Sequence, residues 1–389
     1  MTIEIRQVKT RRDLKTFIHL PEQLHRNHAN WVPPVYVDEY SFFNPAKNKC
    51  FEYSDTLLCL ALQNGRPVGR IMGIINHRYN ERHHDPHARF AFMECPDDTA
   101  MAHTLLQEVE SWALHHNMPK IVGPMGFSDK DPQGFQIEGF EYPPILATAT
   151  NLPYMPSLVE KEGYRKKVDL RDYIFIVPEV IPEIYKKISQ RFSHRDNFRV
   201  LEFKNRRELK PLIHKVFELM NETYTDIFGF DPLNKEEMDE LAARYLPVID
   251  PKFVKMVSID HELTAFVVGM PDICKGIQRA GGRLLPFGWW HILRSMKTSR
   301  HLTLLLGGIK PSYRGLGLDA IMGIRMLESC MERGITLLES HLILETNTKM
   351  IAELEKLGAR EHKRFRIYEK NTGLISGKGS EPVPEPHTQ

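Results

Sequence analysis

The chain carries the same order of predicted elements twice, and this duplication limits its fold more than any other feature. In the first half, a hairpin, a strand, a helix and a strand fall at residues 57–75, 88–93, 99–116 and 120–123. In the second half, the same order falls at residues 253–270, 304–309, 319–333 and 337–344. Asn64-Gly65 marks the first hairpin turn. A pattern that occurs only twice indicates a duplicated α/β unit rather than a solenoid.

The two halves also end alike. NLPYMPSLVEKEGYRKK begins at Asn151 and NTKMIAELEKLGAREHK begins at Asn347, and each reads as a short helix, Glu-Lys, Gly and a basic strand. We place the boundary near residue 175, which gives one domain over residues 1–175 and a second over residues 176–371. Residues 372–389 are rich in Pro, Ser and Gly, and we predict a disordered tail there.

Composition excludes several classes of protein. A chain of 389 residues is too long for one typical core, in agreement with two domains. Lys and Arg number 52 against 50 for Asp and Glu, which argues against a nucleic-acid partner. Five cysteines without CxxC spacing fit a reducing cytosol better than a disulfide framework or a zinc site. Without a signal peptide or a membrane-length apolar run, we expect a cytoplasmic protein, and peripheral attachment to the inner face of the membrane stays open.

One loop of the second half has the composition of a phosphate-binding turn. In LLLGGIKPSYRGLGLDAIMG, residues 304–323, an apolar strand leads through Arg314, Gly315 and Gly317 into a helix. Glycine lets backbone N–H groups approach a ligand, and the start of a helix favours an anion. Arg314 adds a planar fork of donors suited to phosphate oxygens. The loop therefore predicts a bound phosphate, with a tight turn that binds nothing as the alternative.

With KPSYRGLGL, the following helix and strand, and N…LEKLGA in that order, the second half resembles the GNAT superfamily of acyl-CoA-dependent N-acyltransferases. The family loop is commonly Arg or Gln, two residues, Gly, one residue, then Gly or Ala. Arg314, Gly317 and Asp319 stand at those places, so the last position departs from the pattern. The resemblance covers residues 200–370, and over the first half it is architectural. It implies an α/β fold of two tandem GNAT-like domains, each a mixed, mostly antiparallel sheet flanked by helices.

The resemblance also implies a co-substrate, acetyl-CoA or a longer acyl-CoA, and no metal. The N–H groups of residues 314–318 would hold the pyrophosphate, and the end of the preceding strand would pair with the pantetheine arm. The implied cofactor-binding residues are Gly307, Gly308, Ile309, Arg314, Gly315, Leu316, Gly317, Leu318 and Asn347. Asn347 either bonds the pantetheine or caps the following helix.

The first half lacks this loop. Its counterpart is MECPDDTA, where Glu94, Asp97 and Asp98 would repel a pyrophosphate and no glycine opens the backbone. We therefore predict a single acyl-CoA site, in the second half. The first half either shapes the acceptor site or acts as a scaffold.

Acyl transfer to an amine needs a proton acceptor, and the leaving thiolate needs a donor. On the predicted strand 337–344, Glu339, His341 and Glu345 fall on one face, and the opposite face is the more apolar. Glu345, at the end of the strand, is the first candidate for the base. His341 is the second, because the ordinary pKa of histidine suits proton transfer near neutrality. Solvated strand residues without a catalytic role are the alternative.

The donor is harder to place. Many members of the family use a Tyr on the helix after the Asn, but that position holds Leu354 here. Tyr368, on the last strand, either supplies the missing hydroxyl or is a core tyrosine. The histidine-rich stretch at residues 77–87 lacks the spacing of a metal site, and we expect a solvated loop there.

An insertion precedes the strand of the loop. Apolar and aromatic residues are concentrated over residues 283–297, between Arg283 and Lys297. This composition suits a membrane-surface helix, the mouth of a pocket, or a lid packed on the other domain with Gly281-Gly282 as its hinge. PDICK, GRLLPFGWW and GPMGFSDKDPQGFQIEGFEYPP resemble the two-domain GNAT proteins that include bacterial ceramide synthases. That likeness implies a sphingoid-type lipid amine as acceptor and a long-chain acyl donor. The composition of residues 283–297 itself is what favours peripheral membrane contact there.

The sequence thus predicts an N-acyltransferase that moves an acyl group from a coenzyme A thioester to an amine, by direct attack without a covalent enzyme intermediate. A catalytically inactive acyl-CoA sensor or scaffold is one alternative, favoured by Leu354 and Asp319. A small-amine N-acetyltransferase is another. Transfer of aminoacyl groups from transfer RNA is a third, opposed by the near-zero net charge of +2. Acceptor, acyl chain length and oligomeric state stay open.

Overall fold

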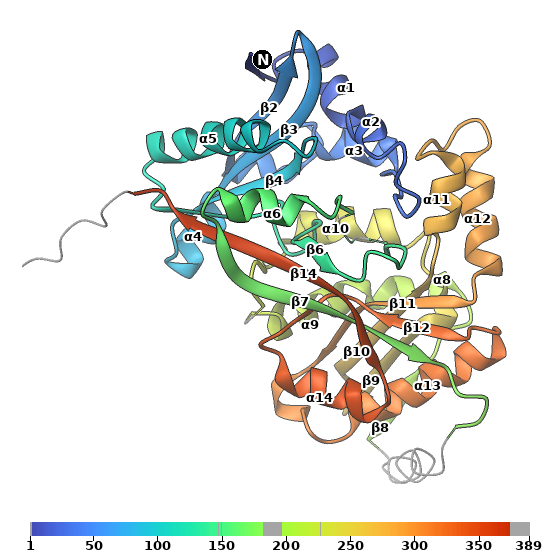
Figure 1. Cartoon of the computed structure of the whole chain (residues 1–389). Helices are drawn as coiled ribbons and strands as arrows, with labels where there is room; N and C mark the ends of the chain where they lie inside the picture. The colour runs from blue at the N-terminus through green and yellow to red at the C-terminus, as the bar shows by residue number, and fades with distance from the viewer. Residues whose placement is uncertain (1, 147, 149, 182–196, 226, 374–389) are drawn as a thin grey trace, which may run out of the picture.

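The computed structural model describes residues 2–146, 148, 150–181, 197–225 and 227–373, and its centre is one continuous sheet (Figure 1). The strands run in the order β1-β2-β3-β4-β5-β14-β7-β12-β11-β10-β9-β8, with β13 beside β7 and β6 beside β14. Helices cover both faces, as expected for a mixed α/β protein. Apart from residues 372 and 373, the predicted disordered tail lies outside the described residues.

The first half follows the predicted order of elements. Its strands are β1 (Ile3–Gln7), β2 (Ser54–Gln63), β3 (Arg66–Asn76), β4 (Ala88–Glu94), β5 (Lys120–Gly123), β6 (Phe135–Glu138) and β7 (Arg165–Ile176). Its helices are α1 (Arg11–His19), α2 (Pro21–Leu24), α3 (Tyr36–Phe42), the 3₁₀ helix η1 (Lys49–Tyr53), α4 (His77–His83), α5 (Thr99–His115) and α6 (Met155–Lys161). The predicted hairpin turn is confirmed, since Asn64 and Gly65 both have positive φ, at 52° and 76°.

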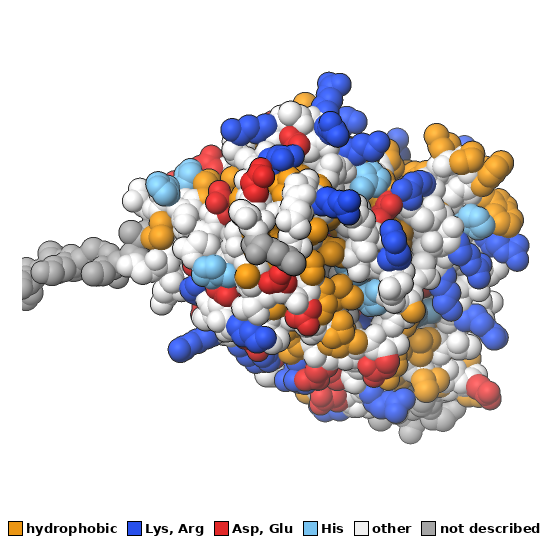
Figure 2. Space-filling model, turned by 45° about the horizontal axis from the view of Figure 1, so that its top comes forward, with side chains coloured by type: hydrophobic (Ala, Val, Ile, Leu, Met, Phe, Trp, Pro, Cys, Tyr) orange, Lys and Arg blue, Asp and Glu red, His pale blue; other side chains and the backbone are white. Residues whose placement is uncertain are grey.

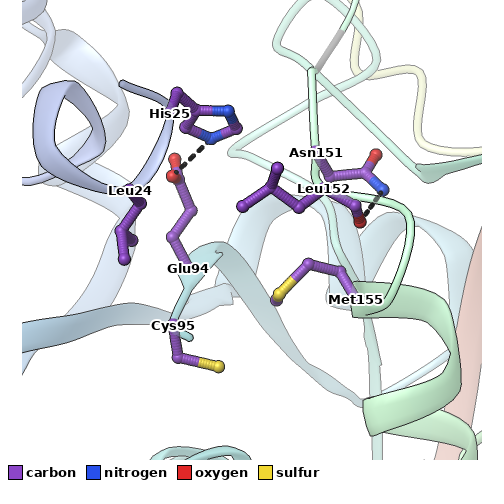
Figure 3. A pocket seen from close by; sticks show the side chains of 7 residues that line it. All are labelled: Leu24, His25, Glu94, Cys95, Asn151, Leu152 and Met155. Atoms are coloured by element: carbon purple, nitrogen blue, oxygen red, sulfur yellow. Dashed lines mark hydrogen bonds and ion pairs between the residues drawn. The ribbon is translucent and has the colours of Figure 1, made fainter. Parts of the chain in front are cut away.

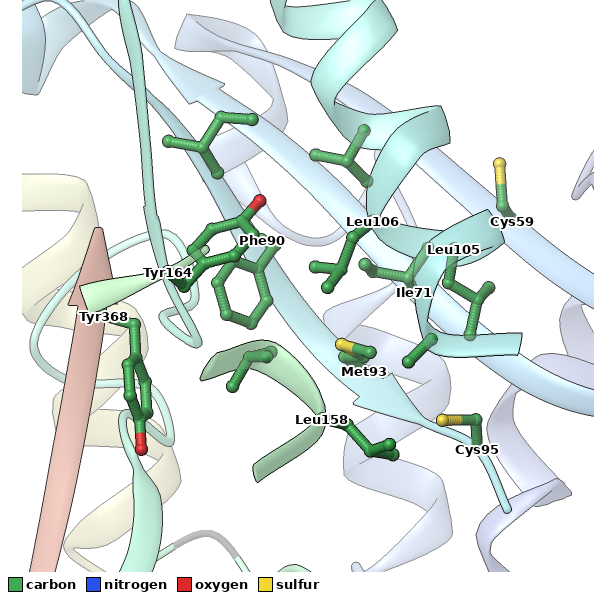
Figure 4. Packing of buried hydrophobic residues seen from close by; sticks show 14 of the residues in the cluster. Cys59, Ile71, Phe90, Met93, Cys95, Leu105, Leu106, Leu158, Tyr164 and Tyr368 are labelled. Carbon is green, nitrogen blue, oxygen red and sulfur yellow. The ribbon is translucent and has the colours of Figure 1, made fainter. Parts of the chain in front are cut away.

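Successive residues of each strand point to opposite faces of the sheet, so this half has a hydrophobic layer on each face. Cys59 and Ala61 of β2 point to the α5 face and join a large core cluster there (Figure 4). Leu60 and Leu62 point to the opposite face and pack with α1 and α3. The histidine-rich stretch is not the predicted solvated loop, because residues 77–83 form α4 and His87 is fully buried.

The second half repeats the arrangement. Its strands are β8 (Phe198–Leu201), β9 (Val254–Ile259), β10 (Glu262–Pro271), β11 (His301–Ile309), β12 (Leu337–Ser340), β13 (Ile343–Leu344) and β14 (Arg360–Asn371). Its α-helices are α8 (Arg206–Leu209), α9 (Ile213–Thr223), α10 (Lys235–Tyr245), α11 (Cys274–Ala280), α12 (Gly288–Thr298), α13 (Leu318–Glu332) and α14 (Thr348–Lys356). Three short 3₁₀ helices are η2 (Lys210–Leu212), η3 (Pro251–Phe253) and η4 (Pro311–Tyr313). Helices α9 and α10 pack on one face of β9–β11, and α13 packs on the other.

The last strand of each half lies against the other half. β14 pairs with β5, with Tyr368 opposite Gly123, and β7 pairs with β12, with Phe175 opposite Leu338. β7 and β14 pair with each other along most of their length and cross the middle of the molecule side by side (Figure 1). The predicted boundary near residue 175 therefore cuts the chain at the end of β7 but does not cut the sheet.

Candidate functional site

The predicted strand-loop-helix at residues 304–323 is confirmed. β11 ends at Ile309, η4 follows, and α13 begins at Leu318. Gly315 and Gly317 have φ of 77° and 86°, in the left-handed region that side chains with a Cβ disfavour. Nothing lies within 4 Å of a Cβ built at Gly315, so its backbone conformation, and not crowding, requires glycine there.

Backbone N–H groups are open along this loop. Among the residues that the structure describes, no acceptor bonds the N–H groups of Gly315, Leu316 or Gly317. The first N–H groups of α13 also lack partners within the helix, and no side chain caps them. The exposed Arg314 side chain braces the loop, because its Nε lies 3.2 Å from the carbonyl oxygen of Ile309. Open N–H groups, a helix start and a guanidinium together can bind an anionic group.

Beside this loop, two parallel strands separate. β11 and β12 pair only from His301 opposite Leu337 to Leu304 opposite Ser340. β11 then continues to Ile309 along β10, whereas the chain after Ser340 turns to β13, which pairs with β7. The prediction of one strand over residues 337–344 is therefore wrong, since it breaks at His341 and Leu342. Within the described part of the chain, the separation leaves residues 306–309 of β11 with a strand partner, β10, on one side only.

A β-bulge lies where the strands separate. Val268 of β10 pairs with Leu306 and Gly269 pairs with Leu304, so Leu305 is the extra residue of β11. Leu304 packs on the α13 face, and Leu305 packs with α11 and α12 on the other face. The bulge thus turns the backbone at the point where the gap between β11 and β12 begins.

The free edge of β11 meets a tyrosine that the sequence analysis did not single out. Tyr224 directly follows α9, and its hydroxyl accepts from the Gly307 N–H at 3.1 Å and donates to the Gly307 carbonyl oxygen at 3.0 Å. Burial raises the pKa of Tyr224 to about 12, so the phenol stays protonated at neutral pH. No motif surrounds Tyr224 in the sequence, and only the fold places it at Gly307.

A cavity of about 410 Å³ is bordered by the segment that directly follows Tyr224. It is lined by Tyr79, His83, Lys167, Val168, Thr225, Ile227, Phe228, Leu344 and Thr346. The lining residues belong to α4 and β7 of the first half, to the segment after Tyr224, and to β13 and the residues directly after it. Its volume is in the range of small-molecule sites, which commonly form between domains.

Glu345, the first candidate for the base, is engaged elsewhere. One of its oxygens lies 2.7 Å from the Lys166 Nζ, and the other accepts from the Asp169 N–H at 3.0 Å. Partial burial opposes ionisation, but the Lys166 ammonium and the Asp169 N–H outweigh it and lower the pKa of Glu345. Since both of its oxygens are engaged, this carboxylate mainly fastens the chain after β13 to β7.

His341, the second candidate, lies directly after the last paired residue of β12. Burial lowers its pKa to about 4, so the ring is neutral at physiological pH. The expectation of an ordinary histidine pKa is therefore wrong. The ring can still accept a hydrogen bond at the point where the strands separate.

Glu339 does not share an exposed face with His341. It is buried within an ion network, with the Lys363 Nζ at 2.5 Å and His301 Nε2 at 2.6 Å. The same Nζ lies 3.1 Å from Asp172. Asp172, Glu339 and His362 lie close enough together to hold a metal, but the Lys363 ammonium already lies between the two carboxylates. The cluster is therefore a buried ion network at the centre of the shared sheet.

Two other predicted site residues have structural roles. Tyr368 is fully buried in the core of the first half, where its hydroxyl donates to Glu160 at 3.0 Å (Figure 4). This position argues against the predicted catalytic role, because β14 carries Tyr368 away from the loop and against β5. Asn347 caps α14, since its side chain accepts from the Met350 N–H at 3.3 Å.

The counterpart of the loop in the first half is filled. Glu94, at the end of β4, pairs with Arg70 at 2.8 Å. It also pairs with His25 at 2.9 Å (Figure 3). Asp98 caps α5 and takes the N–H groups that an anion would need. The pocket beside Glu94 has a volume of only about 10 Å³, about enough for one water molecule. This geometry supports the prediction that acyl-CoA binds in the second half alone.

The insertion forms a helical hairpin of α11 and α12. Gly281 ends α11 with φ of 58°, and the Gly282 carbonyl accepts from the Tyr36 N–H at 3.0 Å. Instead of the predicted flexible hinge, the two glycines make a turn that is bonded to the first half. The hairpin covers Leu305, the extra residue of β11.

Comparisons with known proteins agree with this fold. No family model matches the chain. The chain is 28% identical over 381 residues to Protein YghO of Escherichia coli strain K12, covering 94% of this chain and 95% of that protein. It is 30% identical over 373 residues to a bacterial ceramide synthase of Caulobacter vibrioides, covering 93% of this chain and 96% of that protein.

Two solved structures cover nearly the whole chain. A tandem GNAT protein from the clavulanic acid biosynthesis pathway superposes with a TM-score of 0.55 at 12% identity, covering 96% of this chain and all (100%) of that one. A GCN5-related N-acetyltransferase from Sphaerobacter thermophilus gives a TM-score of 0.53 at 12% identity, covering 95% and 96%. At these identities the structures show a shared fold.

Proposed function

Since the chain belongs to the tandem GNAT family that includes the bacterial ceramide synthase of Caulobacter vibrioides, we propose that it transfers an acyl group from a coenzyme A thioester to an amine. The observation that carries the proposal is the glycine turn with open N–H groups directly beside the separating strands β11 and β12. A ligand with an anionic end and a long amide-bearing arm fits both features.

In the proposed complex, the diphosphate binds the open N–H groups of Gly315, Leu316 and Gly317. Arg314 then exchanges its contact with the Ile309 carbonyl for the phosphate oxygens. The pantetheine arm lies along the free edge of β11 and takes the hydrogen bonds of Gly307 that the Tyr224 hydroxyl makes in the unliganded protein. The thioester then lies near the bulge at Leu305.

The reaction proposed at this place is direct attack. The amine nitrogen forms a bond to the thioester carbon, the carbon–sulfur bond breaks, and the thiolate takes a proton. His341 is our candidate for the acceptor of the amine proton, because its neutral ring lies at the point of separation. Leu354 stands where many family members have the tyrosine that protonates the thiolate. Tyr224 is our candidate for this proton donor, since its phenol is protonated and lies at β11.

The name of the Caulobacter relative supports a long-chain lipid amine as the acceptor. The cavity beside β13 offers apolar and polar lining from both halves, which suits a chain with an amino-alcohol head. A small polyamine as acceptor is the competing proposal. The two are separated by measuring free thiol released from acetyl-CoA and palmitoyl-CoA with sphinganine or with spermidine. Turnover with spermidine and none with sphinganine would refute the lipid acceptor.

Coenzyme A binding tests the loop itself. Arg314→Glu places a negative charge where the diphosphate is proposed to bind, and we expect at least a tenfold weaker affinity in calorimetry, about 1.4 kcal/mol or more. Arg325→Glu, on the same helix but beyond its first turn, is the matched control and should bind as the unmodified protein does. Unchanged binding by Arg314→Glu would remove the basis of the proposed site. Binding without thiol release in the presence of any amine would favour an acyl-CoA sensor.

A further inference from the structure

The outer surface of the α11–α12 hairpin exposes an unusual group of apolar side chains. Leu285 is 80% exposed and Phe287 is 71% exposed. Trp289, Trp290 and Leu293 are also exposed. Figure 2 shows hydrophobic side chains gathered at this edge of the molecule, next to Lys and Arg side chains. Single exposed apolar residues are ordinary, but five within nine positions mark an interaction surface.

The hairpin tip is defined as residues 283–293, and the charged residues of the hairpin itself are all basic. No Asp or Glu occurs from residue 273 to residue 318. Lys and Arg residues occur at Lys275, Arg279, Arg283, Arg294, Lys297 and Arg300. Arg294 lies over the Trp290 ring at 5.4 Å, while Arg283 is paired with Glu22 at 2.7 Å. An apolar, indole-bearing tip with a basic rim complements an anionic lipid surface.

The hairpin is closely packed, and it is bonded to the first half of the chain. A Cβ at Gly288 would lie 1.7 Å from the Arg283 carbonyl oxygen, so the turn closes tightly on itself. A Cβ at Gly276 would lie 2.7 Å from the His291 carbonyl oxygen, so the two helices are in close contact. At the base, the Gln278 side chain donates to the Trp31 carbonyl at 3.0 Å. These contacts fix the exposed side chains in place instead of letting them fold inward.

We propose that the hairpin tip inserts its apolar side chains into the interfacial region of an anionic lipid bilayer. None of the described helices combines the length and the apolar character of a membrane span. The proposed contact is with the surface of the bilayer. The inner face of the same hairpin packs on Leu305 through Ile277 and Ile292. The surface that meets the bilayer is therefore one helix layer from the proposed acyl-transfer site, a position that suits an acceptor drawn from the membrane. This last step rests on the proposed function, whereas membrane binding itself does not.

Co-sedimentation with vesicles tests the proposal on the full chain. We expect binding to vesicles of equal parts phosphatidylglycerol and phosphatidylcholine, and much weaker binding to phosphatidylcholine alone. Phe287→Ser with Trp290→Ser should weaken binding to the mixed vesicles by about tenfold or more. Arg294→Gln with Lys297→Gln should weaken the same binding and reduce its sensitivity to salt. Leu114→Ser, at an exposed position of α5 that is 37% accessible, is the matched control and should bind normally.

Several results would overturn this inference. One is the absence of vesicle binding by the unmodified protein, and another is unchanged binding after the Phe287 and Trp290 substitutions. A third is a dimer in sedimentation velocity that the same substitutions convert to a monomer, without vesicle binding, since the tip would then meet a second copy of the chain. Circular dichroism of each variant checks folding. Coenzyme A affinity should not change in the tip variants, so failure of membrane binding is distinguishable from failure of the proposed function.

Discussion

Tyr224→Phe separates binding of the co-substrate from chemistry. The substitution removes one oxygen, which bonds both the N–H and the carbonyl of Gly307 at 3.1 and 3.0 Å. If the pantetheine arm takes these groups, the hydroxyl competes with it. A neutral hydrogen bond contributes about 0.5–1.5 kcal/mol net, so the two bonds oppose the ligand by about 1–3 kcal/mol. Gly307 is exposed, and water replaces the hydroxyl in the variant. We therefore expect the lower limit, about 1 kcal/mol, or about fivefold tighter coenzyme A binding.

The assay is calorimetric titration of both proteins with coenzyme A and with adenosine 5′-diphosphate. The second ligand carries a diphosphate but no pantetheine arm, so its affinity should be equal for the two proteins. Turnover should fall in the variant even as binding tightens, because the leaving thiolate loses its proposed donor. Weaker or unchanged coenzyme A binding would refute the proposed path of the arm along β11. An equal gain for both ligands would show instead that Tyr224 acts on the loop.

Three further predictions concern the surroundings of the site. Lys363→Met leaves the buried carboxylate of Asp172 without a cationic partner among the described residues, and Glu339 keeps only its histidine partners. It should lower the free energy of unfolding by about 3–5 kcal/mol in urea denaturation, whereas Lys370→Met, at a more accessible pair with Glu110, should cost about 1 kcal/mol or less. Asp319→Asn removes a carboxylate from the first turn of α13, so coenzyme A should bind more tightly by about 0.3–1 kcal/mol in calorimetry while the melting temperature falls slightly. Burial lowers the pKa of His341 to about 4, so its ring is already deprotonated above that pH. The pH profile of kcat/KM should therefore show no inflection near pH 6.5. His341→Asn should lower kcat throughout the neutral range.

The parts of the site that local chemistry determines were predictable from the sequence. Gly315 and Gly317 are required by positive φ at a strand-to-helix turn, and that requirement appears directly as residue type. Asn64-Gly65 marks its hairpin for the same reason. The absence of an anion site at the corresponding loop of the first half, residues 93–100, was also predictable. Asp98 is an N-cap residue there and occupies the N–H groups that an anion would otherwise bind.

The parts that depend on distant segments were not predictable. From the sequence, Tyr368 is either the missing hydroxyl or a core tyrosine, and only the pairing of β14 with β5 decides for the core of the first half. The run at residues 337–344 reads as one strand, because the sequence does not reveal that its two ends have different partners. Tyr224 carries no motif, and its role depends on where α9 ends relative to β11. Strand pairing and helix docking are set by tertiary packing, which overrides local propensity.

The exchange of last strands explains why the first half is present at all. After Ser340 the chain no longer pairs with β11, and it continues as β13 along β7, a strand of the first half that also pairs with β12. Glu345 strengthens this pairing through Lys166. Without β7, the chain after Ser340 would have no partner on that side, and the gap that is proposed to admit the pantetheine arm would lose one wall. In the first half, Glu94 and Asp98 fill the counterpart of the loop. This half contributes β7, which pairs with both β12 and β13, and it supplies part of the cavity. On this argument, the two halves form one catalytic unit, and a fragment without β7 should neither fold stably nor bind coenzyme A.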